Sequence, residues 1–452
     1  MKKTICVLLS FALCLCLIAG CGQTGNNESK PDQGSSTAKT EPVAPTQNET
    51  TDSKLKADIV FWSSYSESSN YGEVTKAAAE AFMKENPGVK IEVSFQGTDI
   101  QSTLGPALEA GTKVTMFEAN TDASTELWLD RMMDLNEYYN TVFPQTDGKA
   151  YGDTIHQAYN VLAKMQGKGK YLYFPYTPQF ITIWYNKDIF EACGITEKPQ
   201  TWNELMAICQ KLVDNGYIPF TSDQTHIHFS FGYYLQRRLG DDAAKALVNS
   251  KDGHEWSDPA VLEAAKAYED AAKKGYFAPN IMTVVSPEAQ QEMVIDRKIA
   301  MYVGGSWMPN NVRESAGNDY RWGSIRFPLV ENGVDDGHSL CYGCYGISIN
   351  KDATKEEADA AAAFAVFLTL GEWGNYYVEK CNAIPMTPGT EWPELIQDAS
   401  QIFDGITNRW TAQTALCINN DLLPVIKSGL TKLMGGTCTA EECIAEIQSY
   451  WK

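Results

Sequence analysis

Strand and helix patterns alternate along most of this chain, and that alternation restricts the possible folds more than any other feature. At residues 58–62 a short apolar strand is predicted, followed by an amphipathic helix at 72–85 and an alternating strand at 89–95. Two strands joined by one helix favour a right-handed parallel crossover. The first part of the folded chain is therefore predicted to be a β-α-β unit.

Similar signals continue toward the C-terminus. Thr201, Thr354 and Thr439 each precede a Glu by three residues, the capping-box pattern of a helix start. Strand-like runs at 181–185 and 299–303 lie between helical segments. The fold class is therefore predicted to be α/β, with mostly parallel sheets flanked by helices. Because a single sheet rarely organises so long a chain, two lobes are expected.

The N-terminus has the pattern of a secretory signal peptide. Lys2 and Lys3 precede an apolar run from Ile5 to Ile18, which is too short to span a membrane as a helix. The segment that ends at Cys21 resembles a bacterial lipobox, which implies cleavage after residues 1–20 and lipid attachment to the Cys21 thiol. An ordinary secretory signal followed by a chance cysteine is the alternative.

Residues 21–56 are rich in Gly, Ser, Thr, Asn, Gln and Pro and contain no aromatic residue. Such a segment cannot bury enough apolar surface to fold, so it is predicted to be a disordered tether. The protein is expected to be lipid-anchored at the extracytoplasmic face of the cell membrane. The even number of cysteines after the tether permits disulfides there without showing which ones form.

Charge and motifs exclude several function classes. With 57 acidic and 37 basic residues, the net charge is −20, so phosphate backbones are repelled and no nucleic-acid partner is expected. The chain has no P-loop, dinucleotide fingerprint, nucleophile elbow or zincin motif. Neither a catalytic residue, a cofactor nor a metal site is predicted, and we expect a binding protein and not an enzyme.

Three tryptophans lie where a ligand could contact them. Trp62 ends the first strand, Trp307 follows a Gly-Gly-Ser turn, and Trp410 is placed early in an expected helix. A flat indole matches the apolar C–H face of a sugar ring, while amide and carboxylate side chains can bind sugar hydroxyls. These positions favour a carbohydrate ligand.

Several stretches carry a resemblance to a known family. They are residues 175–187, 190–195, 199–205, 300–307, 346–351 and 383–385, together with the C-terminal tail. In these stretches the chain resembles extracellular solute-binding proteins of family 1, the substrate-binding lipoproteins of ABC sugar importers. The resemblance extends over nearly all of residues 57–452.

The resemblance implies two α/β lobes joined by a hinge, in the periplasmic-binding-protein-like fold, that close on a ligand. The first lobe would comprise 57–176 plus 326–388, and the second 177–325 plus 389–452. A monomer would capture a sugar, most simply an oligosaccharide, and deliver it to the transmembrane subunits of an ABC permease. The small-molecule carbohydrate, the permease and the membrane are thus the expected partners.

The resemblance also implies ligand-binding residues. Trp307 matches a tryptophan that stacks on sugar, and Trp410 falls where a second stacking aromatic is frequent. Gln179 replaces an acidic ligand of well-studied members, which indicates a different sugar. The looser candidates lie on loops that face the cleft in the family, and they are Trp62, Ser63, Glu67, Asn120, Asp122 and Asp223.

Three other functions remain open from sequence. The same scaffold could bind a polyamine or a phosphodiester. An extracellular glycoside hydrolase is a second alternative, because 57 acidic residues always supply carboxylate pairs. A surface adhesin is the third, and it predicts no stabilisation by small ligands.

Overall fold

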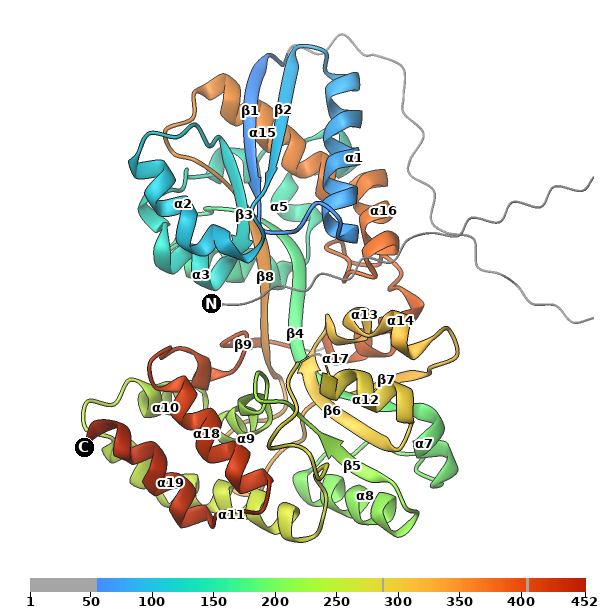
Figure 1. Cartoon of the computed structure of the whole chain (residues 1–452). Coiled ribbons are helices and arrows are strands. Elements are labelled where there is room, and N and C mark those ends of the chain that lie inside the picture. The colour runs from blue at the N-terminus through green and yellow to red at the C-terminus, as the bar shows by residue number, and fades with distance from the viewer. Residues whose placement is uncertain (1–54, 287, 404–405) are drawn as a thin grey trace, which may run out of the picture. The chain divides into compact units, whose positions relative to one another are not determined.

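The computed structural model describes residues 55–286, 288–403 and 406–452 (Figure 1). The predicted signal peptide, Cys21 and nearly all of the predicted tether lie outside these ranges. Within the described ranges, no helix combines the length and apolar character that a bilayer crossing requires. The eight cysteines of these ranges are free thiols, and six of them are buried.

The predicted β-α-β unit is confirmed. Strand β1 (Ala57–Ser63) and strand β2 (Val89–Phe95) pair in parallel, and helix α1 (Asn70–Glu85) connects them. The helix begins where the Ser69 hydroxyl accepts a hydrogen bond from the backbone N–H of Gly72 at 3.1 Å. Its apolar face, which includes Phe82, is buried. The spacing of apolar residues in the sequence therefore located both strands and the helix.

The strands form one connected sheet in the order β2-β1-β3-β8-β4-β6-β5, with β7 added beside β4 and β9 beside β8. The remaining strand bounds are β3 (Met116–Asn120), β4 (Phe174–Asn186), β5 (Ile218–Thr221), β6 (Ile299–Gly305), β7 (Trp322–Ile325), β8 (Ser339–Ile349) and β9 (Asn408–Trp410). The sheet therefore joins strands from the first and last quarters of the chain.

The sheet is mixed, which corrects the prediction of mostly parallel pairing. Among the described strands, β1/β2, β1/β3, β5/β6 and β8/β9 are parallel. The pairs β3/β8, β4/β8, β4/β6 and β4/β7 are antiparallel. Every antiparallel pair includes β4 or β8, the two longest strands. The chain passes along β4 in one direction and along β8 in the opposite direction, which is why this central pair is antiparallel.

Strand β4 belongs to two groups of strands. Its first half, up to Phe180, pairs with β8, and its second half, from Ile181, pairs with β6 and β7 (Figure 1). Between Tyr176 and Pro178 the register shifts, and Thr177 has a positive φ of 45°. A non-glycine residue in this conformation marks a local irregularity in the strand.

Helices cover the sheet as the capping signals predict. The boxes at Thr201, Thr354 and Thr439 begin α8 (Trp202–Asp214), α15 (Lys355–Thr369) and α19 (Ala440–Gln448). Helix α15 packs against α1 and β1, which lie beside it in Figure 1. The other α-helices are α2 (Ile100–Glu109), α3 (Thr121–Leu127), α4 (Asn136–Tyr139), α5 (Tyr151–Thr154), α6 (Gln157–Gln166), α7 (Lys187–Ala192), α9 (His228–Leu239), α10 (Asp241–Val248), α11 (Pro259–Lys273), α12 (Glu288–Asp296), α13 (Met308–Asn311), α14 (Arg313–Ala316), α16 (Gly371–Cys381), α17 (Ser400–Phe403) and α18 (Leu423–Met434).

One buried cation fastens helix α9 to the segment before β8. Arg237 is 1% exposed and forms an ion pair with Asp335. Its guanidinium also donates hydrogen bonds to the carbonyl oxygens of Phe327, at 3.0 and 3.2 Å, and of Ser339, at 3.1 Å. Asp335 and two carbonyl oxygens thus accept hydrogen bonds from this buried charge, which a low-dielectric interior would otherwise destabilise.

Candidate functional site

Two of the predicted site residues, Gln179 and Trp307, lie in the same pocket. Its lining residues come from four separate segments and are Tyr71, Thr177, Pro178, Gln179, Ser306, Trp307, Asn310, Asn382, Ala383 and Ile384. The pocket holds about 240 Å³ of empty space, including some open solvent. We call it the Trp307 pocket. It combines one indole with amides and hydroxyls, the composition expected of a site for a small polar ligand.

The position of Trp307 depends on the glycine two residues before it. Strand β6 ends at Gly305, and the backbone N–H of Ser306 donates to the Phe180 carbonyl at 2.9 Å. A Cβ atom added at Gly305 would lie only 2.1 Å from the indole of Trp307. The indole therefore packs against a bare backbone, and any larger residue at position 305 would push it away.

The polar groups of the pocket differ in what they already bind. The Asn310 amide donates to the Cys381 carbonyl at 2.6 Å, and the Thr177 hydroxyl hydrogen-bonds to Tyr377. Asn382 ends α16 in the left-handed conformation, and its buried Nδ2 has no hydrogen-bond partner in the described part of the chain. A buried amide without a partner costs free energy that a ligand acceptor could recover.

A tyrosine wall adjoins the pocket and was missed by sequence reasoning, which followed tryptophans. Tyr71 lines the pocket, and Tyr65 stacks on it with ring centroids 4.5 Å apart. Tyr65 also stacks on Tyr345 of β8 at 5.6 Å. Since Tyr65 lies two residues after the end of β1 and Tyr71 lies at the start of α1, the available signal was two aromatics placed just after a predicted strand.

The carboxyl group of Glu118, which is fully buried on β3, bonds to the two serines that precede Tyr65. It accepts hydrogen bonds from the Ser64 hydroxyl at 2.7 Å, from the Ser64 backbone N–H at 3.1 Å and from the Ser63 hydroxyl at 3.4 Å. Burial raises the pKa of Glu118 to about 7, although the serine donors oppose that rise. Predicted site residue Ser63 is thus buried and bonded to Glu118, and it does not line the pocket.

Asn120 and Asp122 already have partners in the chain. The Asn120 side chain caps α3, where it accepts hydrogen bonds from the backbone N–H of Asp122 at 3.1 Å and of Ala123 at 3.3 Å. Both carboxylate oxygens of Asp122 bind Arg409 of β9, at 2.7 and 2.9 Å, and Gln166 donates to one of them at 2.8 Å. Neither residue lines the Trp307 pocket.

Trp410 lies in strand β9, so the expected helix at this position is wrong. The three residues of β9 extend the sheet beside the start of β8, and sheet pairing overrides the local helical pattern. Trp410 is 6% exposed, with the guanidinium of Arg237 5.0 Å from its ring centroid. Trp410 is therefore largely buried, and it is not among the lining residues of the Trp307 pocket.

Trp62 and Glu67 also lie outside the pocket. Trp62 is partly buried on β1, where it pairs with Ser94 of β2 and Phe117 of β3. Glu67 is exposed and forms an ion pair with Lys76 at 2.5 Å. Both residues were predicted to lie on a loop at the end of the first strand. In the structure Trp62 belongs to the strand itself, and Glu67 lies on the surface beyond it.

Asp223 is fully buried in a hydrogen-bonded network. It accepts a hydrogen bond from the Tyr302 hydroxyl at 2.5 Å and lies 3.0 Å from Nδ1 of His226. Burial alone would raise the pKa of Asp223, but the hydrogen bonds from His226 and Tyr302 hold that pKa below its usual value. Its oxygens are thus occupied by the chain itself.

In the described ranges no group of three or more His, Cys, Asp or Glu side chains could hold a metal ion.

The family model described as "Bacterial extracellular solute-binding protein" matches residues 65–373. The chain belongs to this family. The matched residues begin just after β1 and extend through β8 and α15 into α16, so they include every segment of the Trp307 pocket except the one at Asn382.

Individual members of the solute-binding family are similar at low identity. The diacetylchitobiose binding protein NgcE of Streptomyces coelicolor is 24% identical over 53% of this chain, a match that spans half of that protein's own length. The sn-glycerol-3-phosphate-binding periplasmic protein UgpB of Escherichia coli K12 is 21% identical, covering 73% of this chain and 74% of that protein. The solved structure of a chitin oligosaccharide binding protein has a TM-score of 0.64 at 18% identity, covering 88% and 98% of the two chains. The solute-binding fold is thus shared.

Gly305 offers a direct test of how this solute-binding protein positions its indole. We expect Gly305→Ala to lower the free energy of unfolding by about 1–3 kcal/mol, because the added methyl group overlaps the Trp307 ring. Urea denaturation measures this effect. In the double variant with Trp307→Ala, the clash is gone, so the two losses should be clearly less than additive. Additive losses would contradict the contact.

Glu118 gives the protein a predictable dependence of stability on pH. Its pKa rises from a usual 4.5 to about 7 on folding, so the folded state binds the proton more tightly. The contribution of Glu118 to stability should therefore be most favourable below pH 4.5 and fall as the pH rises through 7. We expect Glu118→Gln to gain on the order of 3 kcal/mol relative to the parent between pH 4.5 and pH 8. Denaturant unfolding at both pH values checks this, and parallel pH profiles would contradict it.

Proposed function

We propose that this solute-binding protein binds a carbohydrate, with Trp307 stacked on a sugar ring. The observation that carries the proposal is the composition of the Trp307 pocket: one indole, the Gln179 amide and the unpartnered Nδ2 of Asn382. A stacked indole contributes about 0.5–1.5 kcal/mol beyond area burial. Amide groups then discriminate among hydroxyl arrangements, because an unmatched buried polar group is penalised.

The pocket favours a neutral ligand over the charged alternatives. None of its lining side chains is charged; its polar members are amides, hydroxyls and the Tyr71 phenol. A phosphodiester would call for a cation such as arginine, and a polyamine for a carboxylate. The glycerol phosphate named for one relative would meet the same lack of a cation, whereas the diacetylchitobiose named for another is uncharged. We therefore propose a neutral oligosaccharide.

We further propose two hinged lobes. The chain would first pass from one lobe to the other in β4 at Thr177, where the strand register shifts. The sequence predicted that the chain returns to the first lobe at residue 326. Two contacts with elements of the second lobe favour a later return, within β8: the Phe327 carbonyl accepts a hydrogen bond from Arg237 of α9, and Cys341 pairs with β9. Beyond that point Ile347 pairs with β3. The ligand would shift the lobes toward closure because it contacts both only when closed.

The remaining parts of the proposal concern delivery and anchoring. We propose that the protein is a non-catalytic monomer that passes its sugar to an ABC permease, held to the membrane by lipid on Cys21. Replacing Cys21 with Ala is expected to move the protein from the membrane fraction to the medium, since the acyl chains supply the anchoring free energy. Unchanged membrane association of the variant would contradict the lipid anchor.

Thermal unfolding in the presence of individual sugars tests the ligand proposal. The panel should include glucose, N-acetylglucosamine, diacetylchitobiose and raffinose, with putrescine and glycerol phosphate as charged comparisons. A saturating sugar should raise Tm, because ligand that binds only the folded state stabilises it. Response to a charged compound alone would overturn the sugar proposal, and turnover of the responding sugar would overturn the non-catalytic one. The ligand-binding roles predicted for the seven other residues stay predictions, without a place in this pocket.

A further inference from the structure

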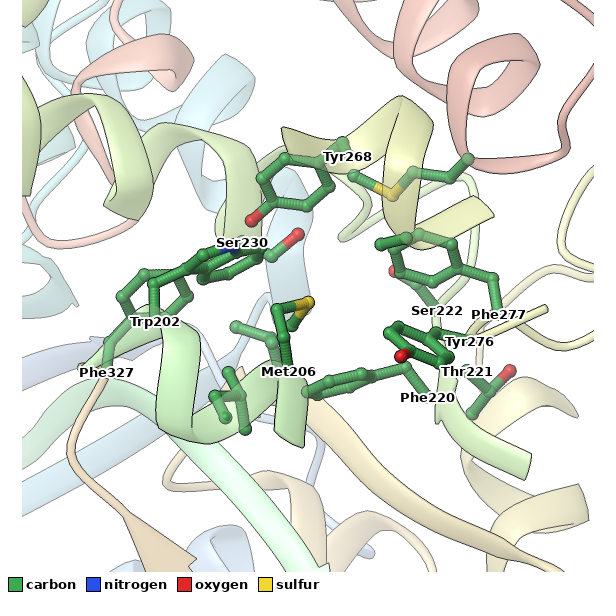
Figure 2. Close-up of a pocket in the computed structure, with 14 residues that line it drawn as sticks. Trp202, Met206, Phe220, Thr221, Ser222, Ser230, Tyr268, Tyr276, Phe277 and Phe327 are labelled. Carbon is green, nitrogen blue, oxygen red and sulfur yellow. The ribbon is translucent and has the colours of Figure 1, made fainter. Parts of the chain in front are cut away.

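A second cavity, which shares no lining residue with the Trp307 pocket, lies among α8, α9, α11 and β5. It has about 450 Å³ of empty space, including some open solvent. We call it the Trp202 cavity after its aromatic lining, which Figure 2 shows: Trp202, Phe220, Tyr268, Tyr276, Phe277 and Phe327. No charged side chain lines it. The cavity is thus far more apolar than the pocket proposed for a sugar.

One buried hydroxyl of this cavity faces another hydroxyl of its lining. The Tyr268 side chain is 1% exposed, and its hydroxyl interacts with the Ser230 hydroxyl without reaching standard hydrogen-bond geometry. Figure 2 shows this hydroxyl beside the hydroxyl of Ser230 at one corner of the cavity. By contrast, the Tyr276 hydroxyl on the same cavity donates to Gln210 at 2.9 Å. Two hydroxyls that bond each other only weakly keep capacity for a further hydrogen bond, so the Tyr268 corner is where a ligand hydroxyl would be stabilised.

The cavity reaches the surface beside flexible side chains. Met206 and Phe277 are only partly buried, whereas Trp202, Tyr268 and Phe327 are almost fully buried. Methionine is unbranched and adapts its conformation easily, so movement of Met206 could admit a small molecule. A compact ring fits the space better than a chain of sugar rings, which would leave most hydroxyls unmatched.

We propose that the Trp202 cavity is a second binding site, for a small neutral aromatic molecule that carries one hydroxyl group, a phenol. The ring would lie among the aromatic side chains, with edge or offset contacts to Trp202 and Phe277. The hydroxyl would donate to or accept from Tyr268 and Ser230. Apolar cavities in protein interiors bind small aromatic molecules readily, and the hydroxyl adds selectivity for phenol over toluene. The inference does not depend on the proposed sugar ligand.

Titration calorimetry of the purified protein with phenol and with toluene tests the proposal. We expect saturable binding of one phenol per chain, tighter than that of toluene. Tyr268→Phe should weaken phenol binding by about 5- to 10-fold and leave toluene binding unchanged, because it removes only the hydroxyl. The matched control is Tyr276→Phe, which deletes a hydroxyl already bonded to Gln210 and should leave phenol affinity unchanged.

A filling variant separates this cavity from other sites. Met206→Phe adds a ring at the half-buried edge, where the fold can accommodate it, and should abolish binding of both phenol and toluene. Absence of phenol binding to the parent protein would overturn the proposal. Equal losses in Tyr268→Phe and Tyr276→Phe, or full phenol affinity in Met206→Phe, would overturn it as well. The sugar response in the thermal assay should be the same in all three variants.

Discussion

Replacing Trp307 with Ala is expected to weaken binding of the responding sugar by about 30-fold or more. The indole lies in the Trp307 pocket beside Gln179 and Asn382, and it is the only tryptophan among the lining residues. Truncating a central aromatic anchor typically costs about 2 kcal/mol or more, which corresponds to that change in Kd. Isothermal titration calorimetry of the sugar identified by thermal unfolding measures the loss directly.

Two further variants make this result specific. Trp307→Phe keeps an aromatic face and should retain part of the affinity, because stacking survives on a smaller ring. Trp451→Ala is the matched control: this tryptophan is also partly buried, and its indole N–H donates to the Ser250 carbonyl at 3.0 Å, outside the pocket. Its removal should change Kd by less than about 2-fold. Full affinity in Trp307→Ala would place the sugar elsewhere.

Local pattern was sufficient for much of the fold. The strands at 58–62 and 89–95 and the three Thr-x-x-Glu helix starts depend on residues close in sequence, and they were predicted correctly. Strand direction was not predictable in this way. Whether β4 pairs in parallel or antiparallel depends on β6 and β8, which lie more than a hundred residues away along the chain. Pairing between distant segments leaves no periodic signal.

The same contrast applies to the candidate site. Trp307 and Gln179 were predicted because both lie in stretches that resemble the family, and the structure brings them into one pocket. Asn382 comes from another segment, and nothing local distinguishes it from an ordinary surface residue. Tyr71 was missed although it lies just after a predicted strand, because the prediction considered tryptophans. The helix expected around Trp410 was wrong because three residues of strand carry too little pattern to outweigh the helical signal around them.

Asp335→Ala is expected to produce the largest loss of stability, about 3–5 kcal/mol in the free energy of unfolding. Arg237 is 1% exposed, and Asp335 is the anionic side chain that pairs with it. Removing the carboxylate leaves a guanidinium charge buried against two carbonyls, and desolvation of an unmatched charge is costly. The contact also holds the segment before β8 against α9, so its loss loosens both. Urea denaturation at neutral pH measures the effect.

The neighbouring aspartate supplies the control. Asp336 has the same charge and lies one residue further along, but it is exposed, and it accepts a hydrogen bond from the local backbone N–H of His338 at 3.0 Å. Asp336→Ala should therefore cost less than about 1 kcal/mol. A second variant, Asp335→Ala with Arg237→Met, removes the orphaned charge and should recover part of the stability, because a buried pair replaced by apolar groups is often tolerated. If Asp335→Ala and Asp336→Ala were equally stable, or the double variant were weaker than Asp335→Ala, the ion pair would not be what joins α9 to this segment.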